Sequence, residues 1–97
     1  MNTVTASRYV AEMKPDRLLS RIKRGQANNV RFADLLRLCR SLGFDVLRTS
    51  GSHHILGHRR FSEMVNLQEV RGEAKPYQIR QLVRLVERYN LQIEDSQ

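Results

Sequence analysis

The sequence predicts an α+β fold in which helices cover one face of a three-stranded antiparallel sheet. Apolar residues recur at helical spacing near both ends of the chain, and short alternating runs lie between them. Glycine or proline separates these runs. Three strands alone leave their apolar face exposed, so the helices are expected on that face and the opposite face is expected to be open.

Composition and charge limit the classes of protein to consider. The chain has 97 residues with 40% hydrophobic and 28% charged, which is typical of one small folded domain. No stretch of 18 apolar residues occurs and Met1 to Arg8 lack a secretory apolar core, so a cytoplasmic protein without a membrane segment is expected. The net charge of +7 suits nucleic acid, an acidic protein or an ordinary solvated surface.

Two helices are predicted in the first half of the chain. The first begins at Pro15 and Asp16, which favour a first helical turn, and ends at Gly25. We assign it to an amino-terminal arm, residues 1–30. The second helix begins the main domain, residues 31–93, and ends at Gly43. Its apolar stripe consists of Phe32, Leu35, Leu36, Cys39 and Leu42.

Three short strands and a closing helix are predicted in the second half. The strands are expected at Phe44–Arg48, Ser52–His58 and Met64–Gln68, with turns between them. Pro76 begins the last helix, and Asn90 ends it. The predicted order is therefore helix, helix, three strands, helix.

The three histidines of the second strand are the candidates for chemistry, because imidazole exchanges protons near neutral pH. His54 and His58 point to one face and His53 to the other. The pattern is compatible with helices on either face of this strand. If the helices cover the Ile55 side, His53 is shielded and His54 is the better candidate.

Other kinds of site fit these residues poorly. His54 and His58 lie about 13 Å apart on an extended strand, too far for one metal ion to bridge, so no metal or cofactor is predicted. Ser52 and His53 are neighbours on a strand and face opposite ways, which disfavours a serine–histidine pair. Cys39 lies on the apolar stripe and is expected to be a buried, inert thiol.

About two-thirds of the chain, from Arg31 to Leu91, resembles the HicA family of bacterial and archaeal toxins. The resemblance rests on four features: the helix end Leu42-Gly43-Phe44, Arg48 in the first strand, the run Gly51-Ser52-His53-His54-Ile55-Leu56 and the amphipathic last helix. It implies a fold similar to a double-stranded-RNA-binding domain, α-β-β-β-α, here with an extra amino-terminal helix. It also implies a type II toxin that cleaves mRNA and is held in check by a HicB-like antitoxin protein.

The resemblance assigns roles to individual residues. The family's catalytic histidine is the first after Gly-Ser, which is His53 here. His54 stays the second choice, because the strand period does not determine which face the helices cover. As general base, His53 would take the proton of an RNA 2′-hydroxyl without a metal ion. Candidate RNA-binding residues that hold or stabilise the phosphate are Gly51, Ser52, Arg48, Arg59 and Lys75.

This chain departs from the family pattern in two places. The segment Gly72-Glu73-Ala74-Lys75-Pro76-Tyr77 replaces a proline and histidine segment of many members, and the first thirty residues exceed the minimal toxin. Two other functions therefore remain open. One is an RNA-binding module without catalysis, and the other is a subunit whose basic face meets an acidic protein.

Overall fold

The computed structural model describes residues 12–94 and contains three helices and four strands in this range. Residues 1–11, the start of the predicted amino-terminal arm, lie outside the described residues. The elements are α2 (Pro15–Lys23), α3 (Phe32–Ser41), β1 (Phe44–Ser50), β2 (His53–His58), β3 (Phe61–Val70), β4 (Glu73–Ala74) and α4 (Pro76–Arg88). No helix in residues 12–94 has the length and apolar character that crossing a membrane requires.

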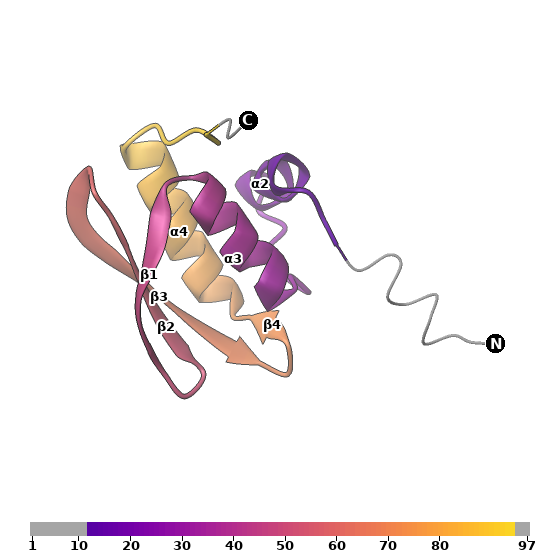
Figure 1. The fold of residues 1–97 in the computed structure, drawn as a ribbon. Helices are drawn as coiled ribbons and strands as arrows, with labels where there is room; N and C mark the ends of the chain where they lie inside the picture. The colour runs from indigo at the N-terminus through magenta and orange to yellow at the C-terminus, as the bar shows by residue number, and fades with distance from the viewer. Residues whose placement is uncertain (1–11, 95–97) are drawn as a thin grey trace.

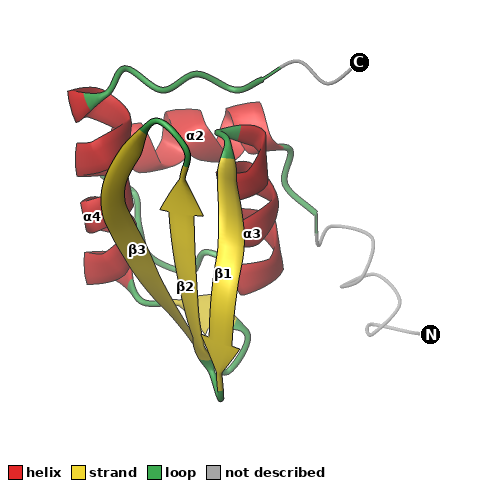
Figure 2. Cartoon of the chain, turned by 60° about the vertical axis from the view of Figure 1, so that its left-hand side comes forward, coloured by secondary structure: helices red, strands yellow, loops and turns green. Residues whose placement is uncertain are grey.

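The strands form one antiparallel sheet in the order β1-β2-β3-β4, which confirms the α+β class. Helices α3 and α4 lie side by side on one face of this sheet, and α2 packs against them on the side away from the strands (Figure 1). No helix of residues 12–94 lies on the opposite face of β1, β2 and β3 (Figure 2). The sheet therefore has one covered and one open face.

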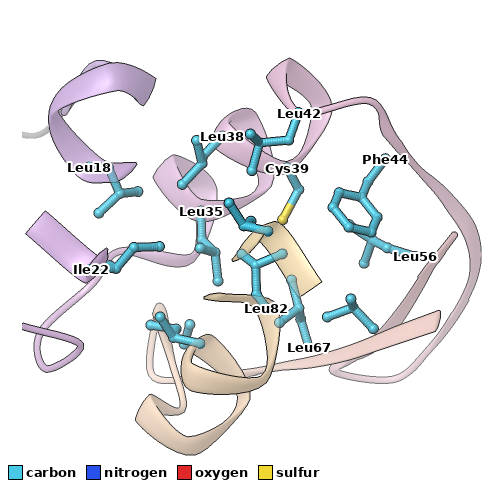
Figure 3. Packing of buried hydrophobic residues seen from close by; sticks show 14 of the residues in the cluster. Leu18, Ile22, Leu35, Leu38, Cys39, Leu42, Phe44, Leu56, Leu67 and Leu82 are labelled. Atoms are coloured by element: carbon cyan, nitrogen blue, oxygen red, sulfur yellow. The ribbon is translucent and has the colours of Figure 1, made fainter. Parts of the chain in front are cut away.

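The hydrophobic core lies between the covered face and the helices. Leu35, Leu38 and Leu82 from the helices meet Leu56 and Leu67 from the strands, and all five are fully buried (Figure 3). Helix α2 adds Leu18 and Ile22 to the same cluster. Burying a leucine stabilises the folded chain by about 1.5–3 kcal/mol, so α2 contributes substantially to this core.

The structure adds a fourth strand to the three that the sequence predicts. Arg71 and Gly72 both adopt positive φ, at 51° and 81°. This is the combination that a two-residue type I′ hairpin turn requires. The chain therefore reverses sharply after Val70, and Glu73–Ala74 pairs with the end of β3. Positive φ at an arginine is uncommon, which is why the sequence did not indicate this turn.

Gly43 ends α3 and allows two other groups to approach the backbone. Its φ is +100°, a backbone conformation that residues with a side chain rarely adopt. A Cβ at this position would lie 2.6 Å from His58 Nε2 and 2.9 Å from Glu94 Oε2. Glycine is therefore required here for both its backbone conformation and its lack of a side chain.

Replacing Gly43 with alanine should destabilise the protein more than the same change at Gly25. Gly25 ends α2 with φ +91°, but a Cβ there meets nothing within 4 Å. Gly25→Ala should cost roughly 1–2 kcal/mol from backbone strain alone, and Gly43→Ala should cost more because His58 must also move. Urea denaturation measures the free energy of unfolding of both variants. Equal losses would show that the close approach to His58 does not affect stability.

Three aromatic rings stack beside the turn between β2 and β3. Phe61 stacks on His58 at 4.6 Å on one side and on Tyr89 at 4.1 Å on the other. The Tyr89 hydroxyl donates to Glu63, which also pairs with Arg88. The hydrogen bond from Tyr89 is the largest cause of a lowered pKa at Glu63, and the same bond raises the pKa of Tyr89.

This pair should contribute to stability only in the middle of the pH range. Glu63 has a folded pKa below its ordinary 4.5, so its contribution is present above pH 4.5 and is lost as pH falls through the lowered value. Tyr89 has a folded pKa above 10.0, so its contribution is present below pH 10 and is lost as pH rises through the raised value. Calorimetry of wild type and Tyr89→Phe should show a difference in melting temperature that shrinks at both extremes. A difference independent of pH would contradict this account.

Candidate functional site

His53 lies on the open face of the sheet at the start of β2. Its side chain is exposed, while Leu56, three residues further along the strand, is fully buried against the helices. Because alternate residues of a strand share a face, Leu56 places His54 and His58 on the helix side and His53, Ile55 and Gly57 on the open side. Of the two arrangements compatible with the sequence, the structure has the one that leaves His53 accessible.

Strand pairing places polar side chains beside His53. Ser50 of β1 and Gln68 of β3 are its direct partners across the sheet. Directly opposed residues of antiparallel strands share a face, so all three belong to the open surface. The next row on this face consists of Arg48, Ile55 and Asn66. Arg48 is exposed, so its guanidinium is available to an anion that contacts the same face as His53.

The Gly51-Ser52 turn presents its backbone directly before His53. Gly51 has φ +60°, the value that a type II′ hairpin requires at its first central residue. A Cβ at Gly51 would meet nothing within 4 Å, so space around this turn is open. The carbonyl of Ser52 accepts a hydrogen bond from Glu69 N at 3.0 Å, which ties the turn to β3.

His54, the second choice, faces the helices. Its ring lies 4.8 Å from the Phe32 ring, and its Nδ1 donates to the Ser52 carbonyl at 3.2 Å. The side chain is half-buried and helps to join the hairpin to α3. His54 therefore has less access to a substrate than His53.

His58 is buried and both of its nitrogens are used within the protein. Nε2 donates to the Leu42 carbonyl at 3.0 Å, and Nδ1 accepts from the backbone of Arg60 at 3.2 Å. These bonds define a neutral ring that carries its proton on Nε2. No nitrogen remains for exchange with a substrate, so His58 is a structural residue.

The predicted phosphate-binding residues do not all lie together. Arg48, Gly51 and Ser52 lie at or near the level of His53. Lys75 follows Ala74, which pairs with Glu69 beside Ser52, so it lies at the same end of the sheet. Arg59 lies at the other end of β2, where it is within 4.0 Å of Glu94, and six strand residues separate it from His53 by roughly 20 Å.

Gln78 supports the strand opposite His53, and the sequence analysis did not identify it. Its side chain is 3% exposed, and its Oε1 accepts a hydrogen bond from the backbone N–H of Gln68 at 2.7 Å. This contact ties the end of β3 to α4. The signal for it was present, since position 78 lies one turn before Leu82 on the apolar stripe, where a polar residue requires a partner.

Comparison of the chain with protein-family models, curated proteins and solved structures gave no match. An assignment of function therefore rests on the geometry of the open face and on the residues of the Gly51–Leu56 run. Within residues 12–94, no group of three or more histidine, cysteine, aspartate or glutamate side chains lies close enough to hold a metal ion. Cys39 is fully buried, and burial raises the pKa of its thiol to about 12, partly offset by Arg40.

A separate basic hollow lies between the first turns of α2 and α3. Its volume is about 610 Å³, and its basic lining residues are Lys14, Arg17, Arg21 and Arg31. Glu12 and Asp34 also line it, and both carboxylates lie within ion-pair distance of Arg37. Helices α2 and α3, whose residues line this hollow, lie on the covered side of the sheet (Figure 1).

Replacing His58 and replacing His53 should have clearly different effects on the free energy of unfolding. His58→Ala leaves the Leu42 carbonyl without its partner and should cost at least roughly 1–3 kcal/mol, in addition to the lost packing on Phe61. His53→Ala changes an exposed side chain and should stay within about 0.5 kcal/mol of wild type. Urea denaturation measures both, and a comparable loss at His53 would mean that this residue has a structural role.

Proposed function

We propose that this chain is a cytoplasmic endoribonuclease of the HicA type, the toxin of a type II toxin–antitoxin pair, which cleaves mRNA without a metal ion. The observation that carries the proposal is the exposure of His53 on the open face, directly after the Gly51-Ser52 turn and one row from Arg48. The order α3, β1–β3, α4 is compatible with the double-stranded-RNA-binding type of domain that the resemblance implies.

In the proposed reaction His53 acts as general base. Its imidazole accepts the proton of a ribose 2′-hydroxyl, the 2′ oxygen forms a bond to the adjacent phosphorus, and the bond from phosphorus to the 5′ oxygen breaks. The departing 5′ oxygen takes a proton from the imidazolium or from water. The products are a 2′,3′-cyclic phosphate and a 5′-hydroxyl end. Arg48 stabilises the negative charge that develops on the phosphoryl oxygens.

The same geometry is compatible with control by a partner protein. A regulator of this enzyme has to cover the exposed sheet face on which the general base His53 lies. A HicB-like antitoxin protein fits this requirement within the proposal.

One observation favours a second candidate, an RNA-binding module without catalysis. The residues paired directly with His53 are Ser50 and Gln68, which are neutral, so no carboxylate in that row orients the imidazole. A polar, partly basic sheet face can bind RNA without cleaving it. Cleavage assays separate the two candidates.

Purified wild-type protein should cleave RNA in the presence of a metal chelator, and His53→Ala should lower the rate at saturating RNA by about 10²- to 10⁴-fold. Arg48→Gln should cause a smaller loss, on the order of 10- to 10²-fold. Arg17→Gln is the matched control, because it removes the same charge from an exposed position on α2. It should leave the rate at saturating RNA unchanged. The 3′ ends of the products should carry cyclic phosphate.

The outcomes discriminate between the candidates. RNA binding by wild type and His53→Ala with no cleavage by either would replace the nuclease with the binding module. Equal cleavage by both proteins would show that another group, or a contaminant, does the chemistry. Equal losses in Arg48→Gln and Arg17→Gln would mean that overall charge matters and the position of Arg48 does not. Growth arrest on expression of wild type but not His53→Ala tests the toxin role.

A further inference from the structure

Two backbone irregularities meet on the open face, about four strand residues beyond His53. The pairing of β1 with β2 shifts register between Val46 and Arg48, which leaves Leu47 without a partner. The pairing of β2 with β3 shifts between Leu56 and His58, where Gly57 alone lies opposite the three β3 residues Ser62, Glu63 and Met64. An extra residue in a strand redirects a side chain, and such bulges are frequent beside functional sites.

These irregularities produce an exposed apolar surface. Leu47 and Met64 are each 61% exposed, and they are two of the three large hydrophobic residues exposed within residues 12–94. Both line a hollow of about 300 Å³ whose floor is Gly57. A Cβ at Gly57 would lie 2.6 Å from Leu47 Cδ1, so the absence of a side chain is what lets Leu47 lie across this position.

The hollow also contains polar groups of opposite kinds. Asp45, Arg59 and Ser62 line it together with the apolar residues. A carboxylate accepts hydrogen bonds, a guanidinium donates them and a hydroxyl does both. Apolar walls with a few polar groups are the usual composition of a small-ligand site, and about 300 Å³ is at the small end of the range for such sites. A single planar heterocycle fits this description, whereas a helix or a folded partner needs a larger surface.

We propose that this hollow is a subsite for one RNA base, which flanks the bond cleaved at His53. The inference rests on the proposed function, because it takes RNA as the ligand of the open face. His53 and Gly57 are four residues apart on β2, roughly 13 Å, and Arg48 lies between them on the same face. A strand whose phosphate contacts Arg48 and His53 therefore places a neighbouring base, and not the cleaved nucleotide, over Leu47 and Met64.

The polar groups favour guanine among the four bases. Arginine donates two hydrogen bonds to the O6 and N7 of guanine, and the amino group of guanine is a donor that a carboxylate can accept. Arg59, whose exposed guanidinium also lies 4.0 Å from Glu94, and Asp45 are the residues of the hollow with these properties. Leu47 and Met64 provide the apolar contact to the base faces that bound, unstacked bases receive in proteins.

The test compares base preference in variants of the hollow. Wild type is given an oligoribonucleotide library with all four bases at each position around the cut, and should prefer guanine roughly tenfold at one flanking position. Met64→Gln, which keeps length but adds polarity, and Gly57→Ala, which displaces Leu47, should lose most of this preference but still cleave. Met64→Leu is the matched control and should retain it. Preference unchanged in Met64→Gln and Gly57→Ala, or absent in wild type, overturns the proposal.

A binding measurement keeps the subsite testable if no cleavage occurs. His53→Ala protein is titrated with short oligoribonucleotides with and without guanine, and the methyl resonances of Leu47 and Met64 are followed by NMR. Shifts at both residues, larger with guanine, support the subsite whether or not the wild type is a nuclease. Methyl groups that do not respond to RNA overturn the subsite, even if wild-type cleavage upholds the proposed function. Shifts that depend on protein concentration alone would assign the hollow to a second copy of the chain.

Discussion

The complete burial of Leu56 determines which way every other side chain on β2 points. Successive residues on a strand alternate between faces, so a leucine held against α3 and α4 directs His54 and His58 inward and His53 outward. A slip of one residue would expose Leu56 and bury His53, at a cost of about 1.5–3 kcal/mol for the leucine alone. The accessibility of the candidate base is thus a consequence of core packing, and it does not depend on any contact that His53 makes itself.

The three histidines show how the same side chain serves different purposes within one strand. His58 lies where the hairpin, α3 and the β2–β3 turn converge, and its two nitrogens bond the Leu42 carbonyl and the Arg60 amide. His54 joins the hairpin to Phe32. Only His53 is left with its ring outside the covered layer. Fixing the inner two residues in place gives the outer one a defined position, because all three share one backbone.

Much of the helical layer could be predicted from the sequence, because proline and glycine mark the helix ends and the apolar spacing is regular. The burial of Leu38 could not be predicted. This residue falls outside the predicted stripe and is buried because both the sheet and α2 cover α3. The sequence indicated which residues are candidates for the site. It did not indicate whether His53 or His54 is accessible, because that depends on which face of the sheet the helices cover. Arg59 was predicted to bind the same phosphate as His53, but the length of β2 separates the two residues. The register shifts at Leu47 and opposite Gly57 had no sequence signal beyond one glycine, and the residues of the hollow lie around them.

The basic residues and the candidate catalytic histidine are distributed differently over the surface of this molecule. The net charge of +7 attracts polyanions, but basic residues line the hollow between α2 and α3 as well as the open face that carries Arg48. In the proposed function, phosphate contacts of this kind depend on salt and not on base sequence, so RNA would be attracted to several sides of the protein. What distinguishes the open face is therefore not its charge but an accessible imidazole on β2 and a partly apolar hollow lined by residues of β1, β2 and β3. In the proposed function, affinity for RNA and cleavage of RNA are therefore separable, since the basic residues are spread over the surface and the candidate general base lies in the row of His53.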